Sequence, residues 1–222
     1  MRFVASAAIA ALTVAAASQA ALIDSNLPMT NAQGQAEGAF SDAISSGGSY
    51  FYGQALAQTV NVSQGYNLSQ LTFWGSSENF IQSGLANIVG FQMVIYSADF
   101  SSVVVSKTWA LGDMQVTPTG ALNSDGGIEY QFAGNLTGGI AAGEYRMSVG
   151  AILADGEGDA FIWSQGEDAS GLYYSVGAGF GTDWTPAPEG YSGSFLLFGN
   201  VPGPGALALL GLAGLSAGRR RR

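Results

Sequence analysis

The stretch Gly143-Glu144-Tyr145-Arg146-Met147-Ser148-Val149 decides the fold class, because polar and apolar side chains alternate along it. In an extended chain its tyrosine, methionine and valine lie on one side, and its glutamate, arginine and serine lie on the other. Residues 128–132, with the sequence Ile-Glu-Tyr-Gln-Phe, alternate in the same way. A period of two predicts β-strands with one face buried and one face in water.

Further strand-like segments recur at short intervals between residues 50 and 200. They cover residues 50–62, 68–74, 88–96, 103–109, 161–163, 172–176 and 194–198. Glycine-rich turns such as Asp125-Gly126-Gly127 separate them, and no segment has a clear helical period. The run 88–96 is almost continuously apolar, which predicts an interior strand buried on both faces. The pattern predicts an all-β fold, an antiparallel β-sandwich of the jelly-roll type, over residues 50–200.

The N-terminal residues have the three parts of a secretory signal peptide. Arg2 is followed by an apolar run, 3–17, and then by Ser18-Gln19-Ala20, the small-residue pattern that a signal peptidase recognises. We therefore expect residues 1–20 to be removed after Ala20. Residues 21–49 are polar and rich in small side chains, and we expect them to form a lead-in to the folded domain.

The C-terminal residues also have three parts. Val201-Pro202-Gly203-Pro204 comes first, an uncharged apolar run follows over 206–218, and Arg219-Arg220-Arg221-Arg222 ends the chain. As a helix the apolar run would be only about 20 Å long, against the ~30 Å hydrocarbon core of a bilayer. The arginines would stay on the cytoplasmic side, so that the domain before them lies outside the cytoplasm.

This order of parts resembles the PEP-CTERM sorting signal of exported bacterial proteins. In that family a Pro-Glu-Pro motif precedes an apolar helix and an arginine cluster, and Gly203 stands here where the family has glutamate. The resemblance implies recognition and cleavage at Val201, Pro202, Gly203 and Pro204 by an exosortase-type membrane peptidase. It also implies a short membrane helix and a cytoplasmic stop at Arg219, Arg220, Arg221 and Arg222. A permanent tail anchor is the alternative. The strand at 141–149 is similar to strands in jelly-roll domains that are attached to such tails.

The composition excludes several classes of function. The chain has neither cysteine nor histidine, which removes disulfides, thiol nucleophiles, histidine-dependent hydrolase triads and the commonest zinc ligand. Without the five arginines of its two end segments, the formal charge changes from −9 to −14. Lys107 and Arg146 are the only cations left between residues 21 and 200. Nucleic-acid binding needs clustered cations and is excluded.

Three carboxylates at alternate positions form a candidate calcium loop. Asp155, Glu157 and Asp159 are separated by glycines, which allow a loop to wrap its oxygen ligands around the ion. The complete twelve-residue calcium-loop pattern is absent, and a solvated hairpin loop explains the same residues. Calcium is therefore an alternative to the expectation that the protein has no cofactor.

Aromatic side chains supply an alternative function, because ring faces stack on sugars in polysaccharide-binding jelly rolls. The candidates are Trp74, Trp109, Trp163, Trp184, Tyr173, Tyr174 and Tyr191. The first three tryptophans fall at strand ends, which favours positions in the core. Trp184 falls in the loop sequence 181–186, so we expect its side chain to be the exposed one among these aromatics and the candidate for stacking on a ligand.

Glu167 and Asp168 follow Trp163 closely, and paired carboxylates near aromatic residues are typical of glycoside hydrolases. Hydrolysis needs two acids about 5 to 10 Å apart on either side of the sugar bond, which adjacent residues do not supply. Any other acid can be the partner, so a polysaccharide hydrolase or lyase is a second alternative.

The sequence as a whole predicts an exported, non-enzymatic protein of the cell surface or extracellular matrix. It is expected to be held at the membrane transiently by its tail before processing. The first alternative is a carbohydrate-binding module that meets an exopolysaccharide.

Overall fold

A computed structural model describes residues 20–41, 54–77, 85, 88–154, 161–168, 170–176 and 181–202. Within these ranges the chain forms two antiparallel sheets and no α-helix. The eight-stranded sheet contains β1 (Ala21–Asn26), β14 (Phe195–Asn200), β4 (Tyr66–Ser77), β11 (Phe161–Ser164), β2 (Gly38–Phe40), β8 (Ile128–Asn135), β7 (Gln115–Leu122) and β9 (Gly139–Ile140). The six-stranded sheet contains, in order, β13 (Thr185–Pro186), β12 (Leu172–Val176), β3 (Gln54–Val62), β10 (Gly143–Leu153), β5 (Ile88–Ser97) and β6 (Val103–Ala110). A 3₁₀ turn, η1 (Leu111–Asp113), follows β6.

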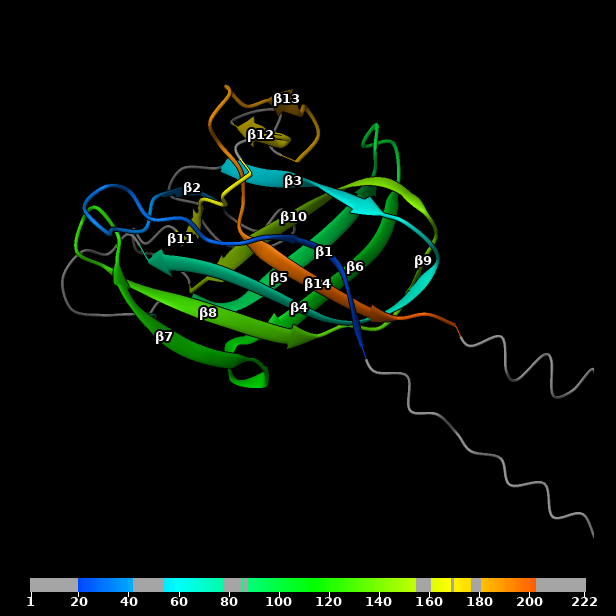
Figure 1. The fold of residues 1–222 in the computed structure, drawn as a ribbon, viewed down its shortest axis with the longest axis horizontal. Helices are drawn as coiled ribbons and strands as arrows, with labels where there is room; N and C mark the ends of the chain where they lie inside the picture. The colour runs from blue at the N-terminus through cyan, green and yellow to red at the C-terminus, as the bar shows by residue number, and fades with distance from the viewer. Residues whose placement is uncertain are drawn as a thin grey trace, which may run out of the picture.

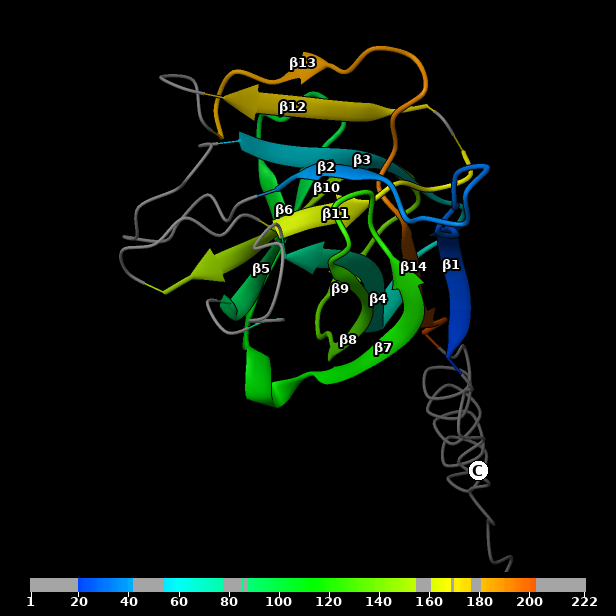
Figure 2. The same ribbon diagram turned by 90° about the vertical axis from the view of Figure 1, so that its left-hand side faces the viewer.

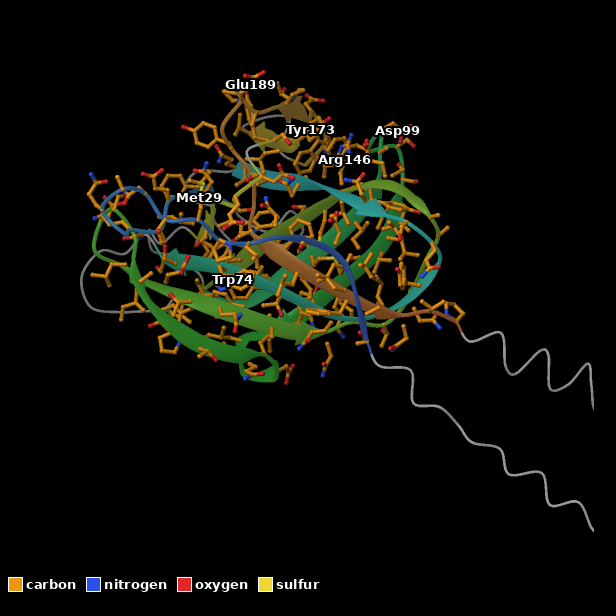
Figure 3. The ribbon with its side chains drawn as sticks, in the orientation of Figure 1. Met29, Trp74, Asp99, Arg146, Tyr173 and Glu189 are labelled. Carbon is orange, nitrogen blue, oxygen red and sulfur yellow. The ribbon has the colours of Figure 1, made fainter. Side chains whose placement is uncertain are left out.

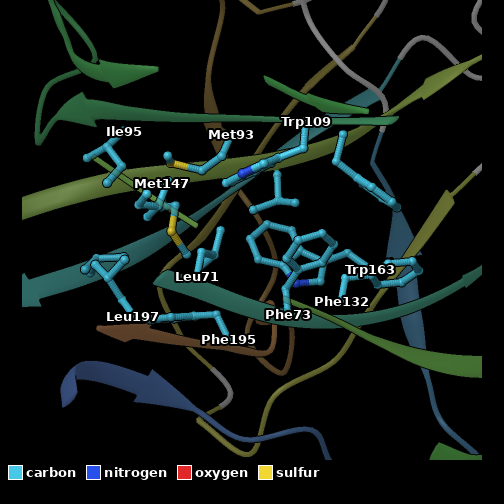
Figure 4. Packing of buried hydrophobic residues seen from close by; sticks show 14 of the residues in the cluster. Leu71, Phe73, Met93, Ile95, Trp109, Phe132, Met147, Trp163, Phe195 and Leu197 are labelled. Atoms are coloured by element: carbon cyan, nitrogen blue, oxygen red, sulfur yellow. The ribbon is translucent and has the colours of Figure 1, made fainter. Parts of the chain in front are cut away.

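The two sheets pack face to face, which is the arrangement of a β-sandwich (Figures 1 and 2). Their inner faces meet at a cluster of four fully buried phenylalanines, Phe73, Phe91, Phe132 and Phe161. Ring centroids within this cluster lie 4.6 to 6.2 Å apart, mostly edge to face, which is the geometry that aromatic quadrupoles prefer. Figure 4 shows the aliphatic and methionine side chains that fill the space beside them. The prediction of an all-β fold is confirmed.

The tryptophans that we expected in the core are buried. Trp74, Trp109 and Trp163 are 7%, 4% and 1% exposed. A buried indole N–H needs an acceptor. Trp109 donates to the carbonyl of Asn135 at 2.9 Å, and Trp163 donates to the carbonyl of Ser194 at 2.9 Å. The run predicted as an interior strand is β5, which lies between β10 and β6.

The polar residues after position 20 belong to the sandwich instead of preceding it. β1 and β2 are the two ends of the strand order β1-β14-β4-β11-β2. An end strand has a neighbour on only one side, so it needs fewer apolar side chains than an interior strand. This is why residues 21–26 and 38–40 form strands although the sequence of 21–49 indicates a lead-in; residues 42–49 of that segment lie outside the described ranges.

The expected division into a solvent-exposed face and a buried face is wrong at four positions. Ile128 of β8, expected on the buried face, is 45% exposed. Arg146 and Ser148 of β10 are 7% and 4% exposed, and the ring of Tyr173 from β12 lies over the Arg146 guanidinium. Glu129 of β8 is 4% exposed, and its carboxylate accepts hydrogen bonds from Ser164 Oγ at 2.6 Å and Thr119 Oγ1 at 2.8 Å. Polar partners allow Glu129 and Arg146 to be buried, since Arg146 pairs with Glu144 of its own strand and donates to Tyr173 of β12.

The start of the first strand and the end of the last lie side by side. β1 pairs with β14 in antiparallel register, with Ala21 opposite Gly199 (Figure 1). β14 also pairs with β4, so it is an interior strand of the eight-stranded sheet. No helix in the described ranges has the length and apolar character to cross a membrane; the apolar run 206–218 lies outside them.

Candidate functional site

Four aromatic side chains gather on the outer face of the six-stranded sheet, and together with Arg146 we call them the aromatic patch. They are Tyr96 of β5, Phe100 of the β5–β6 turn, Tyr173 of β12 and Trp184 of the loop before β13. Figure 3 shows Tyr173, Arg146 and the neighbouring Asp99 close together at this side of the molecule.

The rings of the patch are in direct contact. Trp184 stacks on Phe100, with centroids 4.7 Å apart and planes at 7°. Phe100 also meets Tyr173 edge to face at 5.3 Å, and Tyr96 lies 5.6 Å from Phe100 and 5.8 Å from Trp184. Phe100, Tyr173 and Trp184 are half-buried, whereas Tyr96 lies beneath them. Burial of Tyr96 raises the pKa of its phenol.

The turn between β5 and β6 holds Phe100 against Trp184. The Asp99 carboxylate accepts hydrogen bonds from Ser97 Oγ at 2.7 Å, from Ser101 Oγ at 2.8 Å and from the Ser101 backbone N–H at 3.1 Å. These bonds, that from Ser97 foremost, lower the pKa of Asp99 to about 2. Phe100 has φ 60°, a left-handed conformation that non-glycine residues adopt at a cost, and it is the only such residue among those described.

A buried arginine supports Tyr173 from below. The Arg146 side chain is 9% exposed and pairs with the Glu144 carboxylate at 2.7 Å. It also donates to the Tyr173 hydroxyl at 3.3 Å, and its guanidinium carbon lies 4.8 Å from the centre of the Tyr173 ring. This cation–π contact and the ion pair stabilise the charge in a position that water hardly reaches. One of the two cations between residues 21 and 200 is thus neutralised inside the patch.

The predicted ligand-stacking residue, Trp184, lies in the patch but is less exposed than its loop sequence indicates. The reason is the stack with Phe100, a residue in a different turn. Tyr173 was among the candidate aromatics, whereas Phe100 and Arg146 were not predicted for a site. One sequence signal could have found Phe100: a large aromatic residue follows Ser-Ala-Asp in a tight turn, where glycine is the usual residue.

The other predicted site residues have different outcomes. Asp155, Glu157 and Asp159 lie outside the described residues, as do Gly203, Pro204, Arg219, Arg220, Arg221 and Arg222. Among the residues that the structure describes, no three metal-binding side chains form a group. Val201 and Pro202 are exposed directly after β14.

Asp168 shares a small polar cavity with Asp24 of β1. The cavity measures about 120 Å³, room for roughly four water molecules and too little for a sugar ring. The two Asp24 oxygens accept hydrogen bonds from the backbone N–H groups of Asn61, at 2.6 Å, and Ser25, at 2.9 Å. Asp24 therefore joins β1 to β3. Of the two carboxylates that line this cavity, Asp24 and Asp168, the first thus has a structural role.

No protein-family model matches this chain, and a search of curated proteins finds no significantly similar sequence. The resemblance of residues 201–222 to a sorting signal rests on the motif residues themselves.

The geometry of the patch suits stacking on a ligand. Three half-buried rings supply apolar, electron-rich surface, and the exposed carboxylates of Glu144 and Asp99 lie beside them as hydrogen-bond acceptors. Sugar rings present apolar C–H faces edged by hydroxyl groups, so such a surface matches them. An anionic ligand would be repelled by the acidic protein.

Proposed function

We propose that this chain is an exported, non-enzymatic protein of the cell surface or extracellular matrix, sorted by a PEP-CTERM-like signal at residues 201–222. The positions of the outermost strands support this proposal. β1 begins at Ala21, directly after the expected signal-peptidase site, and β14 ends at Asn200, directly before the Pro-Gly-Pro motif. Removal of both end segments would leave all the described strands in place.

The sorting mechanism assigns a role to each part of the tail. Residues 202–204 would be recognised and cut by an exosortase-type peptidase, 206–218 would lie in the membrane, and 219–222 would remain in the cytoplasm. The mature domain, a sandwich that we propose to be a jelly roll, would carry a charge of −14. Self-repulsion at that charge would keep the released domain soluble outside the cell.

The mass of the protein recovered from the surface of producing cells tests this proposal. We expect a chain that begins at Ala21 and ends within residues 202–204. The variant Pro204→Ala should accumulate with its tail uncut, whereas Gly203→Glu, which restores the family motif, should be cut like the wild type. A surface form that retains the C-terminal arginines would refute processing and favour a permanent tail anchor.

A second candidate function is carbohydrate binding, and the aromatic patch is the observation that favours it. Retention of the protein on insoluble exopolysaccharide tests it. Trp184→Ala removes the ring that stacks on Phe100 and should lower the retained fraction several-fold. The control is Leu122→Ala, which removes an apolar side chain that is 47% exposed on the other sheet. Equal retention of wild type and Trp184→Ala would remove the patch from any binding surface.

Calcium is a separate part of this second candidate. If the loop with Asp155, Glu157 and Asp159 binds calcium, the thermal midpoint should rise with added calcium and fall with EDTA. Substitution of all three acids by asparagine should abolish that difference. An identical midpoint under both conditions would contradict a stabilising calcium site.

A further inference from the structure

A groove separate from the aromatic patch opens at the edge between the two sheets. It has a volume of about 330 Å³ and lies among β2, β3, β12 and the loop that contains residues 187–191. Leu56, Leu172 and Pro188 supply apolar lining, and Tyr174, Tyr191 and Gln54 supply polar groups. A volume of this size lies at the lower end of the range for small-molecule sites.

Strand β12 separates the groove from the patch. Tyr173 and Tyr174 are consecutive residues of this strand, so their side chains point to opposite faces of the sheet. Tyr173 contacts Phe100 in the patch, whereas Tyr174 lines the groove. A substitution in one site therefore leaves the aromatic side chains of the other in place.

The polar groups of the groove are available to a ligand. Neither tyrosine hydroxyl is hydrogen-bonded to a described residue, and Tyr191 is 46% exposed. Gln54 donates from Nε2 to the carbonyl of Phe40 at 2.8 Å, and among the described residues its Oε1 accepts no hydrogen bond. Two tyrosines and a glutamine thus line the groove beside apolar residues.

Among the described residues, no charged side chain lines the groove. A charged ligand would lose hydration there without an ion pair in return, and an anion would also meet the repulsion of an acidic domain. A neutral sugar residue fits both conditions, because its C–H face can pack on tyrosine rings while its hydroxyls bond to the polar groups. We propose that this groove binds a neutral sugar residue of a polysaccharide, a step that rests on the carbohydrate-binding candidate.

The position of the groove agrees with binding by a tethered protein. Gln54 begins β3 and Val62 ends it. The next strand, β4, begins at Tyr66 and pairs Asn67 with Asn200 at the end of β14. Eight residues of strand separate Gln54 from Val62, a distance of about 26 Å. Figure 3 places Glu189, on the loop of the groove, far from the start of β1. A domain held at its C-terminal end would therefore present the groove away from the membrane.

Titration calorimetry of the purified full chain with oligosaccharides tests the proposal. The probes are neutral gluco-, galacto- and manno-oligosaccharides, compared with oligouronates of the same length. A detergent without a sugar head group must be used for the tail. We expect one neutral series to bind, and Tyr191→Ala to weaken that binding about ten-fold or more, as for an aromatic contact at the centre of a site. Leu122→Ala, on the other sheet and outside both sites, should bind the oligosaccharide like the wild type.

Three results would overturn the groove proposal. Binding that is lost in Trp184→Ala but kept in Tyr191→Ala would place the sugar in the patch, and would leave the carbohydrate-binding candidate intact. Stronger binding of the oligouronates would contradict a neutral ligand. The absence of binding of any neutral oligosaccharide at about 10 mM would refute sugar binding in the groove. If Trp184→Ala also leaves the retention on polysaccharide unchanged, the carbohydrate-binding candidate fails as well.

Discussion

Replacing Phe100 by glycine should destabilise the protein less than replacing it by alanine, although glycine loses more backbone entropy on folding than alanine does. Both substitutions remove the same ring, with its contacts to Trp184, Tyr173 and Tyr96, so this loss of about 2 kcal/mol cancels between them. What remains is the backbone at φ 60°. At this φ alanine costs about 1–2 kcal/mol more than glycine, because its Cβ crowds the backbone. Glycine loses ~0.5–1 kcal/mol more chain entropy on folding. The difference favours the glycine variant by ~0.5–1 kcal/mol.

Urea denaturation of the two variants and the wild type measures this difference. One slope of unfolding free energy against urea concentration is used for all three proteins. Ala98→Gly, in the same exposed turn but at a residue without positive φ, is the matched control and should cost about 0.5–1 kcal/mol. The order of alanine and glycine is thus opposite at two positions that are two residues apart. A Phe100→Ala variant as stable as Phe100→Gly would show that the turn holds no strain.

Three further predictions follow from single residues. Gly75→Ala should destabilise the protein by about 2–4 kcal/mol, because the new Cβ would lie 2.5 Å from a backbone carbonyl oxygen of β11. Its control, Gly112→Ala, has open space at the new Cβ and should be within ~0.5 kcal/mol of the wild type in urea denaturation. The turn that contains Asp99 should be stabilised by the ionised carboxylate above pH ~4 and should lose that contribution as the pH falls to about 2, because the folded-state pKa is depressed. A carboxyl NMR titration measures this pKa, and an Asp99→Asn variant that shows the same acid-side loss of protection in the turn would contradict it. Glu129→Ala should cost about 1–3 kcal/mol, because it leaves the buried Ser164 hydroxyl without its acceptor, and Glu129→Gln should cost less. Equal urea midpoints for the wild type and Glu129→Ala would show that the buried carboxylate contributes nothing to stability.

The fold could be predicted because the strands bury apolar side chains in local patterns. The run 88–96 is apolar at almost every position, and it forms an interior strand of the six-stranded sheet. Alternation along 143–149 identified β10 but not the environment of its polar side. Arg146 is buried by Tyr173, 27 residues later in the chain, and no local pattern carries that information.

The candidate sites were harder to predict, because they are assembled from distant segments. The patch combines one turn, three strands and one loop, and the position of Phe100 depends on hydrogen bonds between Ser97, Asp99 and Ser101. Trp184 could be identified from its loop sequence alone, but the ring that it stacks on could not. The groove depends on the separation of the two sheets at their edge, which is set by packing of the whole core.

The interior position of β14 has a mechanical consequence for a protein tethered by its tail. A pull on the tail acts along β14 and is resisted at once by its hydrogen bonds to β1 on one side and β4 on the other. In this shear geometry many bonds must break together, whereas a pull that separates Ala21 from Gly199 would open a single ladder from its end. A tethered domain that holds a polymer should therefore withstand drag along its strands. Cutting the chain beyond Asn200 would release it intact, without unfolding.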